Sequence, residues 1–365
     1  MSTRVLVVDD TAVFRRVITE ALQGVPGVEV SGTASNGKLA LSRIAALEPD
    51  LVTLDIEMPE MNGLEVLEAM RSGGVKTGAI MVSSLTSRGG QLTVRALELG
   101  AFDFITKPER GDAEQNIALV REGLVPIIRA FERSREIRSI LGACGSKSTV
   151  PPVAQPVRTA SGAVSRSPRR TGSPIVLIGV STGGPAALAK LLPSLPSKLG
   201  APVLIVQHMP PLFTGPLAES LRKKCTLAVK EAADGEVALP GHAYVAPGGK
   251  QMKIVPGANG EILVRITDDP PEHNCKPAVD YLFRSAALHF PGRSIAAILT
   301  GMGNDGTEGL RLLKRSGCVS IAQDEASCVV FGMPKEAIAA GVVDTVASLD
   351  DIGGAIVRSL REGHS

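Results

Sequence analysis

The sequence lacks the charge pattern that marks nucleic-acid-binding proteins. Basic and acidic residues nearly balance, 39 against 37, and aromatic residues make up only 3% of the chain. No basic stripe with interleaved aromatic side chains is present. Such a stripe neutralises phosphates and stacks on bases in proteins that bind DNA or RNA. A nucleic-acid partner is therefore not expected.

Long hydrophobic runs and paired cysteines are missing as well. The longest apolar runs, such as residues 174–180, fall far short of the roughly 20 residues that cross a bilayer. Direct membrane insertion is not expected, and the N-terminus enters a strand-like pattern without a signal peptide. The five cysteines are odd in number and include no Cys-x-x-Cys pair, which argues against a disulfide framework and a zinc site. These features predict a protein of the reducing cytoplasm.

The first part of the chain alternates short β-branched segments with segments of helical period. Strands are expected at 5–8, 28–34, 51–54, 79–82 and 102–105. Helices are expected at 12–22, 38–47, 64–71, 91–99 and 113–134. Alternation of this kind predicts an α/β domain with a parallel sheet and helices on both faces.

The length of 365 residues suits two domains rather than one. Residues 146–173 are rich in Ser, Pro, Thr, Ala, Arg and Val, show no period, and cannot bury enough area to offset the entropy of ordering. The predicted division is a first domain over 1–133, a flexible linker over 134–172 and a second domain over 173–362.

The second domain repeats the alternation and is expected to be a doubly wound, mostly parallel α/β fold. Its strands are predicted at 175–180, 203–207 and 295–300, and its helices at 186–192, 217–224, 278–289 and 306–315. Around 241–264, turns rich in Gly and Pro separate short runs such as 243–246. This stretch predicts a β-hairpin insertion rather than another βαβ unit.

Three carboxylates follow predicted strands of the first domain. Asp9 and Asp10 come after the first strand and Asp55 after the third. In open α/β sheets the carboxyl ends of the strands form the ligand-binding edge, so these side chains should converge. Clustered carboxylates repel one another, and Mg²⁺ is a usual remedy. The sequence therefore predicts a Mg²⁺ site.

A cation and two hydroxyls follow the other strands of the same domain. Lys107 ends the fifth strand, and Ser83 and Ser84 end the fourth. A carboxylate beside Mg²⁺ and a lysine can attack a phosphoryl donor, and Asp55 is the expected acceptor. Each residue alone is better explained as a helix cap or a solvated charge. Together, at consecutive strand ends, they favour a phosphorylation site.

These motifs resemble those of a known domain family. V-L-V-V-D-D, L-D-I-E-M-P-x-M-N-G, M-V-S-S and K-P closely resemble the receiver domains of two-component response regulators. The resemblance implies a flavodoxin-like (βα)5 fold and transfer of a phosphoryl group from a histidine kinase to Asp55. It implies that Asp10 and Asp55 hold Mg²⁺ with Asp9 assisting, and that Lys107 pairs with the phosphoryl group.

Two further roles follow from the same resemblance. Ser83 is implied to contact the phosphoryl oxygens, and Phe104 stands at the family's aromatic switch position. Serine at position 83 departs from the family's threonine, which leaves Ser84 as an alternative hydroxyl.

A candidate nucleophile opens the second domain. Residues 179–183 read Gly-Val-Ser-Thr-Gly directly after a strand, and Gly-Pro then begins a helix. Small flanking residues permit a strained turn that exposes the Ser181 hydroxyl at the sheet edge. A glycine-rich turn that binds phosphate shares the same strand-to-helix setting and remains an alternative.

A serine nucleophile needs a base and a group that orients the base. Of five histidines, His208 fits best because it follows a strand expected beside that of Ser181. Asp305 lies in a glycine-rich stretch after a third strand and is the expected orienting carboxylate, though it could also cap the helix that follows. The order Ser, His, Asp differs from the Ser, Asp, His order of α/β-hydrolases.

Three segments together resemble one enzyme family. G-V-S-T-G-G-P, the Q-H-M-P step and G-M-G-x-D-G look like the catalytic domain of the CheB family, the chemotaxis protein-glutamate methylesterases. The resemblance implies Ser181 as nucleophile, His208 as base, Asp305 as its orienting group and Met302 as a donor of a backbone N–H to the oxyanion. His273 lies in a similar loop near the cleft and is assigned no catalytic role.

The resemblance also implies substrates and partners. A phosphorylation-activated hydrolase would remove methyl esters from glutamates on cytoplasmic helices of chemoreceptors and deamidate selected glutamines, which gives adaptation in chemotaxis-type signalling. A chemotaxis-type histidine kinase would be the phosphodonor, and the ester hydrolysis would need no cofactor. Two rival interpretations are a receiver-coupled binding module without activity and a receiver-regulated transcription factor; the latter lacks a basic recognition helix.

Overall fold

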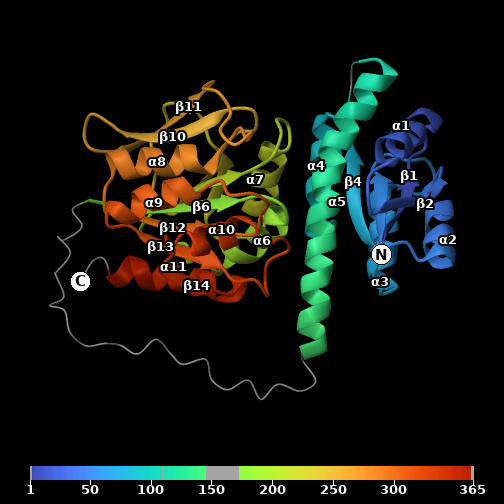
Figure 1. Ribbon diagram of the computed structural model, residues 1–365. Helices are drawn as coiled ribbons and strands as arrows, with labels where there is room; N and C mark the ends of the chain where they lie inside the picture. The colour runs from blue at the N-terminus through green and yellow to red at the C-terminus, as the bar shows by residue number, and fades with distance from the viewer. Residues whose placement is uncertain (1, 109–110, 145–171, 363–365) are drawn as a thin grey trace.

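Two α/β domains lie side by side in the structure (Figure 1). This computed structural model describes residues 2–108, 111–144 and 172–362. In that part of the chain, no helix combines the length and the hydrophobicity needed to cross a membrane.

The first domain is the predicted five-stranded parallel sheet, and its strand order is β2-β1-β3-β4-β5. Its strands are β1 (Thr3–Val8), β2 (Val28–Ala34), β3 (Leu51–Asp55), β4 (Gly78–Ser83) and β5 (Asp103–Thr106). The intervening helices are α1 (Ala12–Leu22), α2 (Gly37–Leu47), α3 (Gly63–Ser72), α4 (Ser87–Glu98) and α5 (Ala113–Cys144). The central strands β1 and β3 are buried on both faces, because helices cover both sides of the sheet.

Helix α5 is longer than the sequence pattern predicted. It continues to Cys144, so the predicted domain boundary at 133 lies inside a helix. The residues beyond 134 still include good helix formers such as Glu, Arg and Leu, and the composition becomes rich in Ser and Pro only later. The rest of the predicted linker, residues 145–171, lies outside the described residues.

The second domain is built on a seven-stranded parallel sheet in the order β14-β13-β12-β6-β7-β9-β8. Its strands are β6 (Ile175–Val180), β7 (Val203–Gln207), β8 (Ala228–Glu231), β9 (His242–Val245), β12 (Ser294–Ile298), β13 (Val319–Gln323) and β14 (Thr345–Ala347). Its helices are α6 (Gly184–Leu191), α7 (Thr214–Arg222), α8 (Val279–His289), α9 (Thr307–Arg315), α10 (Met333–Ala339) and α11 (Leu349–Glu362), with a short 3-10 turn over Leu192–Ser194.

The predicted hairpin insertion is present, but it begins later than expected. Antiparallel strands β10 (Gln251–Pro256) and β11 (Ile262–Thr267) form it, and the hairpin lies over α8 (Figure 1). The run at 243–246, expected in this insertion, instead contributes β9, which pairs in parallel with β7 and β8. Burial explains the difference, because Ala243, Tyr244 and Val245 are all buried, as in an interior strand.

The strand order places the candidate residues of the second domain together. Strand β6, which leads to Ser181, lies between β7 and β12, which lead to His208 and toward Asp305. All three strands are parallel, so their carboxyl ends share one edge of the sheet. This edge is where ligands bind in doubly wound folds.

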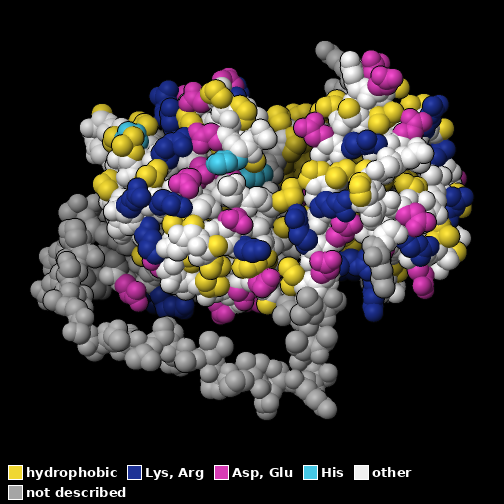
Figure 2. Space-filling view, in the orientation of Figure 1, with side chains coloured by type: hydrophobic (Ala, Val, Ile, Leu, Met, Phe, Trp, Pro, Cys, Tyr) yellow, Lys and Arg dark blue, Asp and Glu magenta, His cyan; other side chains and the backbone are white. Residues whose placement is uncertain are grey.

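The same edge faces the first domain. Phe104 of β5 packs against Phe213 with ring centroids 4.8 Å apart. At the α4–α7 contact, Glu98 accepts a hydrogen bond from the Ser220 hydroxyl at 2.6 Å and pairs with Lys224 at 2.5 Å. Figure 2 shows charged side chains of both signs mixed over the face in view, with hydrophobic side chains gathered where the two domains meet.

Replacing Gly90 with alanine should open this contact between the domains. A Cβ atom at position 90 would lie 2.5 Å from the Leu212 carbonyl oxygen of the other domain, so the backbones must move apart. Helix α4 itself gains about 1 kcal/mol from the substitution. Small-angle X-ray scattering should give a larger radius of gyration, with no loss of stability in the first domain. Gln91→Ala, on the exposed side of α4, is the matched control; equal radii for both variants would contradict the close approach.

Candidate functional sites

The predicted acidic pocket of the first domain is assembled in the structure. The Lys107 ammonium lies 2.7 Å from Asp9 Oδ2 and 2.8 Å from Asp55 Oδ2. Asp9 and Asp55 are buried, whereas Asp10 is exposed at the rim. Asp9 is fixed further by Thr11, whose backbone N–H and hydroxyl both donate to Asp9 Oδ1. Residues distant in sequence thus meet at the carboxyl edge of the sheet.

The pocket fits a hard divalent cation. Asp9, Asp10 and Asp55 each offer a carboxylate oxygen within 4.8 Å of the others, the donor set that Mg²⁺ prefers. Apart from the Lys107 ammonium, Asp9 Oδ2 has no polar partner among the described residues. Burial raises the pKa of Asp55 to about 6 despite the hydrogen bond from Lys107, and the nearby Asp9 adds to the shift. A second cation would relieve this concentration of negative charge.

The two candidate hydroxyls at the end of β4 have different surroundings. Ser83 is buried and accepts a hydrogen bond from Thr93 Oγ1 at 2.8 Å. Ser84 is half-buried, and its hydroxyl donates to Glu57 at 3.1 Å. Ser84 therefore already has a carboxylate partner, which favours Ser83 as the hydroxyl for a phosphoryl group; its role stays a prediction.

In the second domain, a tight turn after β6 presents Ser181. The Ser181 N–H donates to Thr300 O at 3.0 Å, and the Gly184 N–H donates to Ser181 O at 2.8 Å. Gly183 has φ +78°, a conformation that favours glycine, and α6 begins at the next residue. A Cβ atom on Gly301 would lie 2.7 Å from Ser181 Cβ, so only glycine lets this loop pass behind the serine. The turn has the strand-turn-helix form predicted for a nucleophile.

His208 and Asp305 are joined as predicted. His208 Nε2 lies 2.7 Å from Asp305 Oδ2, and Asp305 is 2% exposed. The backbone N–H groups of Val279 and Asp280, in the first turn of α8, donate to the two oxygens of Asp305 at 2.7 and 2.8 Å. Asp305 does not cap the helix that follows it, because α9 begins after Gly306 without a side-chain cap. It caps α8 instead, whose N-terminus stabilises the negative charge.

This pairing shifts both ionisation equilibria toward an ion pair. Burial opposes protonation of His208, but the hydrogen bond to Asp305 and the contact with Cys275 outweigh it and raise the pKa to about 9. Burial alone would raise the pKa of Asp305, yet His208 and the two α8 amides lower it below its usual value. The carboxylate therefore stays ionised and favours the imidazolium form of His208.

Ser181 and His208 are neighbours across two paired strands. Val180 pairs with Gln207 in the β6–β7 ladder, and the His208 N–H donates to Val180 O at 3.1 Å. Within the described residues, no hydrogen bond joins the Ser181 hydroxyl to the imidazole. Since Asp305 occupies Nε2, the ring nitrogen left for the serine is Nδ1, which Cys275 Sγ contacts at 3.6 Å.

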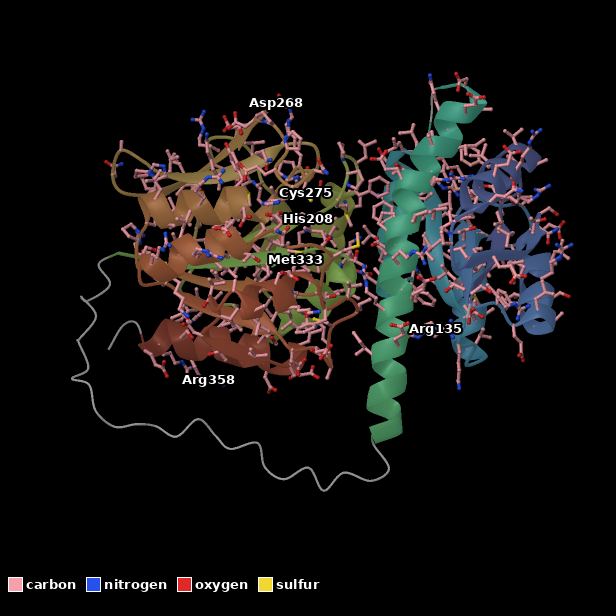
Figure 3. All side chains as sticks on the ribbon, viewed as in Figure 1. Arg135, His208, Asp268, Cys275, Met333 and Arg358 are labelled. Carbon is pink, nitrogen blue, oxygen red and sulfur yellow. The ribbon has the colours of Figure 1, made fainter. Side chains whose placement is uncertain are left out.

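Both residues open onto a cavity shared by the two domains. Its volume is about 640 Å³. Ser181, Thr182, His208 and Met302 line one side, and Phe104, Lys107 and Ile127 are among the residues of the first domain that line the other. Figure 3 shows His208 in the part of the second domain that faces α5. The first domain therefore covers the cavity that holds the candidate nucleophile.

The predicted oxyanion role of Met302 stays a prediction, and its surroundings are compatible with it. Met302 lines the same cavity as Ser181, and its backbone N–H donates to no group in the described part of the chain. A free N–H beside a nucleophile can stabilise a developing oxyanion. His273, to which no catalytic role was assigned, is not among the residues that line this cavity. Its Nε2 lies 3.0 Å from Asp280 Oδ2.

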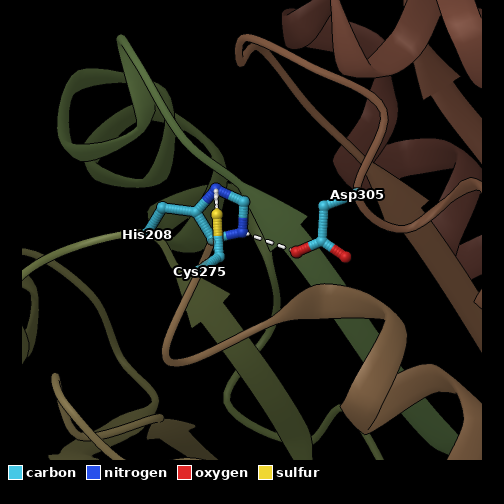
Figure 4. A group of neighbouring side chains, drawn as sticks. All are labelled: His208, Cys275 and Asp305. Carbon is cyan, nitrogen blue, oxygen red and sulfur yellow. Dashed lines mark hydrogen bonds and ion pairs between the residues drawn. The ribbon is translucent and has the colours of Figure 1, made fainter. Parts of the chain in front are cut away.

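Three contributions were missed by the sequence patterns. Gln207 is buried and donates to the carbonyl oxygens of both Ser181 and His208 at 3.0 Å, so it fixes the two turns that carry these residues. The Thr182 hydroxyl donates to Asp103 of the first domain at 2.5 Å. Cys275 lies 3.6 Å from His208 Nδ1 (Figure 4). A polar residue ending an apolar strand could have indicated Gln207, but no sequence signal predicts the other two contacts.

Comparison with known families agrees with the division of the chain into these two domains. The family model for the response regulator receiver domain matches residues 5–118, and the model for the CheB methylesterase matches residues 176–356. Together they define a response regulator whose receiver domain is followed by a hydrolase domain.

Relatives along the whole chain are more specific. The chain is 50% identical to the protein-glutamate methylesterase/protein-glutamine glutaminase of Desulfotalea psychrophila, over 98% of both chains. It is 42% identical to that of Bacillus subtilis, over 98% of this chain and 99% of the relative. The crystal structure of the Thermotoga maritima CheB methylesterase catalytic domain matches with a TM-score of 0.50 and 42% identity, covering 51% of this chain and 98% of that chain. The chain belongs to the CheB family of protein-glutamate methylesterases/protein-glutamine glutaminases.

The ionisation of His208 gives a direct test of the buried pair. NMR of the imidazole should show a protonated ring at pH 7.5 that titrates at about 9, and a lower pKa in Asp305→Asn, because a neutral amide stabilises the cation less. The folded pKa lies above the ordinary value of 6.5. The pair therefore contributes stability that is complete below about pH 6.5 and is lost as the pH rises through about 9. A ring that titrates equally in both proteins would contradict the pairing.

Proposed function

We propose that this protein is a phosphorylation-activated hydrolase that removes methyl esters from glutamate residues of chemoreceptors and deamidates selected receptor glutamines. The observation that carries the proposal is the His208–Asp305 pair beside Ser181 in a cavity covered by a receiver domain. A binding module without activity would not need a buried imidazole-carboxylate pair aligned with a serine turn. Residue roles and substrates are inferred from this geometry and from the family.

The proposed reaction begins with attack of the Ser181 hydroxyl on the γ-carbonyl of a glutamyl methyl ester. His208 Nδ1 accepts the serine proton, while Asp305 holds the opposite nitrogen and stabilises the imidazolium. The Met302 N–H donates to the tetrahedral oxyanion. The imidazolium then protonates the methoxide oxygen as the C–O bond breaks, so methanol departs and the acyl-enzyme remains. Water, deprotonated by His208, attacks the acyl-enzyme, and the imidazolium returns the proton to Ser181 as the glutamate is released. An amide passes through the same kind of oxyanion, so deamidation uses the same groups.

The base acts only when its Nδ1 carries no proton. With a His208 pKa of about 9, most imidazole rings are protonated at neutral pH in the covered arrangement described here. Coverage by the receiver thus opposes activity because it blocks the cavity. The protonated state of His208 has a separate cause, since Asp305 and Cys275 of the second domain raise its pKa while burial opposes protonation. Movement of the receiver would admit both substrate and water.

Phosphorylation is proposed to occur on Asp55. Asp10 and Asp55, assisted by Asp9, would hold Mg²⁺, which neutralises charge on the transferred phosphoryl group. Lys107 and Ser83 would contact the phosphoryl oxygens. Movement of these two side chains would shift β5 and the end of β4, and with them Phe104. Phe104 packs directly on Phe213 of the catalytic domain. This contact supports Phe104 as the residue through which the state of Asp55 affects the interface.

The partners follow from the two reactions. A chemotaxis-type histidine kinase would donate the phosphoryl group, and cytoplasmic helices of a methylated chemoreceptor would be the substrate. The enzyme would then act in the cytoplasm, where both partners present these segments. The ester hydrolysis is proposed to proceed without a cofactor. The receiver would remain tethered through residues 145–171, which are proposed to act as a linker.

The function is tested by mass spectrometry of a methylated receptor fragment incubated with the native protein, with and without a small phosphodonor. The native protein should remove methyl groups, and faster with the phosphodonor. Ser181→Ala should lower the rate by about 10³-fold or more. Asp55→Asn should keep the basal rate and lose the stimulation. Methyl loss that persists in Ser181→Ala would contradict the proposed nucleophile.

Asp103→Ala should raise the basal esterase rate. Asp103 accepts the Thr182 hydrogen bond beside the nucleophile, and burial raises the pKa of this carboxyl to about 6. Removing it deletes one interdomain hydrogen bond, which is worth about 1 kcal/mol and corresponds to a roughly fivefold shift toward the open state. The change is measured as methanol release without phosphodonor. Glu122→Ala, at an exposed position on α5, is the control; equal rates for both variants would contradict a restraining role for the hydrogen bond.

A further inference from the structure

A carboxylate of the receiver is held by two side chains of the second domain. Glu98, the last residue of α4, accepts a hydrogen bond from the Ser220 hydroxyl at 2.6 Å. The other oxygen of the same carboxylate pairs with the Lys224 ammonium at 2.5 Å. Ser220 lies in the last turn of α7, and Lys224 follows two residues after this helix. Figure 1 shows α7 on the side of the second domain that faces the receiver.

Helix α4 extends from the rim of the candidate active site to this carboxylate site. Leu85, two residues before α4 begins, lines the cavity that contains the proposed nucleophile. The α4 backbone then passes against the second domain at Gly90, where a Cβ atom would lie 2.5 Å from the Leu212 carbonyl oxygen. The helix has 12 residues, so about 18 Å separates its two ends. The cavity rim and the carboxylate site therefore lie roughly three helical turns apart.

The surface under α4 has the features of a site that binds a helix. Leu97, next to Glu98, lines a second cavity between the domains together with Gly183 and Ala186 of the second domain. Close approach near the start of α4 depends on the small residue Gly90. This surface thus accepts a helix with a small residue near one end and a leucine and a carboxylate near the other.

The cation at this site depends on the receiver for its partner. Arg222 and Lys223 both pair with Glu219 of their own helix. Lys224 pairs with Glu98 and forms no other ion pair within the described residues. When the receiver moves away, Lys224 loses its partner while its two neighbours keep theirs. An ammonium beside a hydroxyl is then available to another carboxylate.

We propose that Ser220 and Lys224 form a docking subsite for a carboxylate on the helical receptor substrate, and that α4 occupies the place of this substrate helix while the receiver covers the second domain. The inference rests on the proposed esterase function and specifies part of its substrate recognition. The expected partner is a receptor helix with an acidic residue about three turns from the methylated glutamate. Such a helix would place its ester at the cavity of Ser181 and its carboxylate on Lys224.

Kinetics of Lys224→Ala on two substrates test the subsite. With saturating phosphodonor, KM for a methylated receptor fragment should rise about fivefold, because one charged contact is lost, and kcat should change less than about twofold. N-acetylglutamate γ-methyl ester is too small to reach position 224 from the cavity, so kcat/KM for this ester should stay unchanged. Lys314→Ala is the matched control, since Lys314 also pairs with one carboxylate and is 40% exposed, against 37% for Lys224. It should keep the native values for both substrates.

Glu98→Ala separates docking of the substrate from coverage by the receiver. Glu98→Ala and Lys224→Ala break the same ion pair, so both should raise the basal rate on the small ester by up to about fivefold without phosphodonor. With phosphodonor, Glu98→Ala should leave KM for the receptor fragment at the native value, because Glu98 belongs to the receiver. The rise in KM should therefore be specific to Lys224→Ala.

The outcomes separate the subsite from the function on which it rests. Equal KM values for the receptor fragment in Lys224→Ala, Glu98→Ala and Lys314→Ala would overturn the docking role and leave the esterase intact. A matching rise in KM for the small ester would also overturn it, because the lysine would then act on the cavity rather than on a helix. Methyl loss that persists in Ser181→Ala would overturn the proposed function and the subsite with it.

Discussion

The hydrogen bond between His208 and Asp305 is the interaction on which the proposed active site depends. It joins the segments that follow β7 and β12. Two backbone N–H groups of α8 also bind Asp305, so a third element meets them at the same point. A buried carboxylate with three donors stays ionised, and the ionised carboxylate fixes which imidazole nitrogen faces the serine. Ser181, Met302 and Cys275 are each arranged around the ring that this bond orients.

The same edge of the sheet faces the receiver and is the proposed regulatory surface. The receiver contributes β5, α4 and α5 to the interface. Phe104 of β5 packs on Phe213, and Asp103 of β5 accepts a hydrogen bond from Thr182, the residue after the proposed nucleophile. The acidic pocket of Asp9, Asp55 and Lys107 lies at the carboxyl end of the receiver strands, so β5 carries both Lys107 at its end and the interface residues. A short strand thus connects the proposed phosphorylation site directly to the proposed catalytic cleft.

Local sequence signals predicted much of this arrangement. Strands β2, β6 and β7 and helix α1 occupy the predicted residues, because β-branched runs and helical spacing are strong where an element is buried on one or both faces. The Ser181, His208 and Asp305 positions were predictable because each follows a strand of one parallel sheet. Strand β9 was misplaced in the hairpin, since its membership of the main sheet depends on pairing with β7, which no local pattern encodes. Contacts from Cys275 and Asp103 depend on a loop fold and on domain packing, and both are tertiary properties.

The central claim is that Ser181 is an activated nucleophile whose accessibility depends on phosphorylation of the receiver. Labelling with a fluorophosphonate, followed by peptide mass spectrometry, tests it on the whole protein. The account predicts a single adduct on Ser181 that forms several times faster after addition of a phosphodonor, and no adduct in a His208→Ala variant. Labelling at another residue, or a rate on Ser181 that ignores both the phosphodonor and His208, would contradict it.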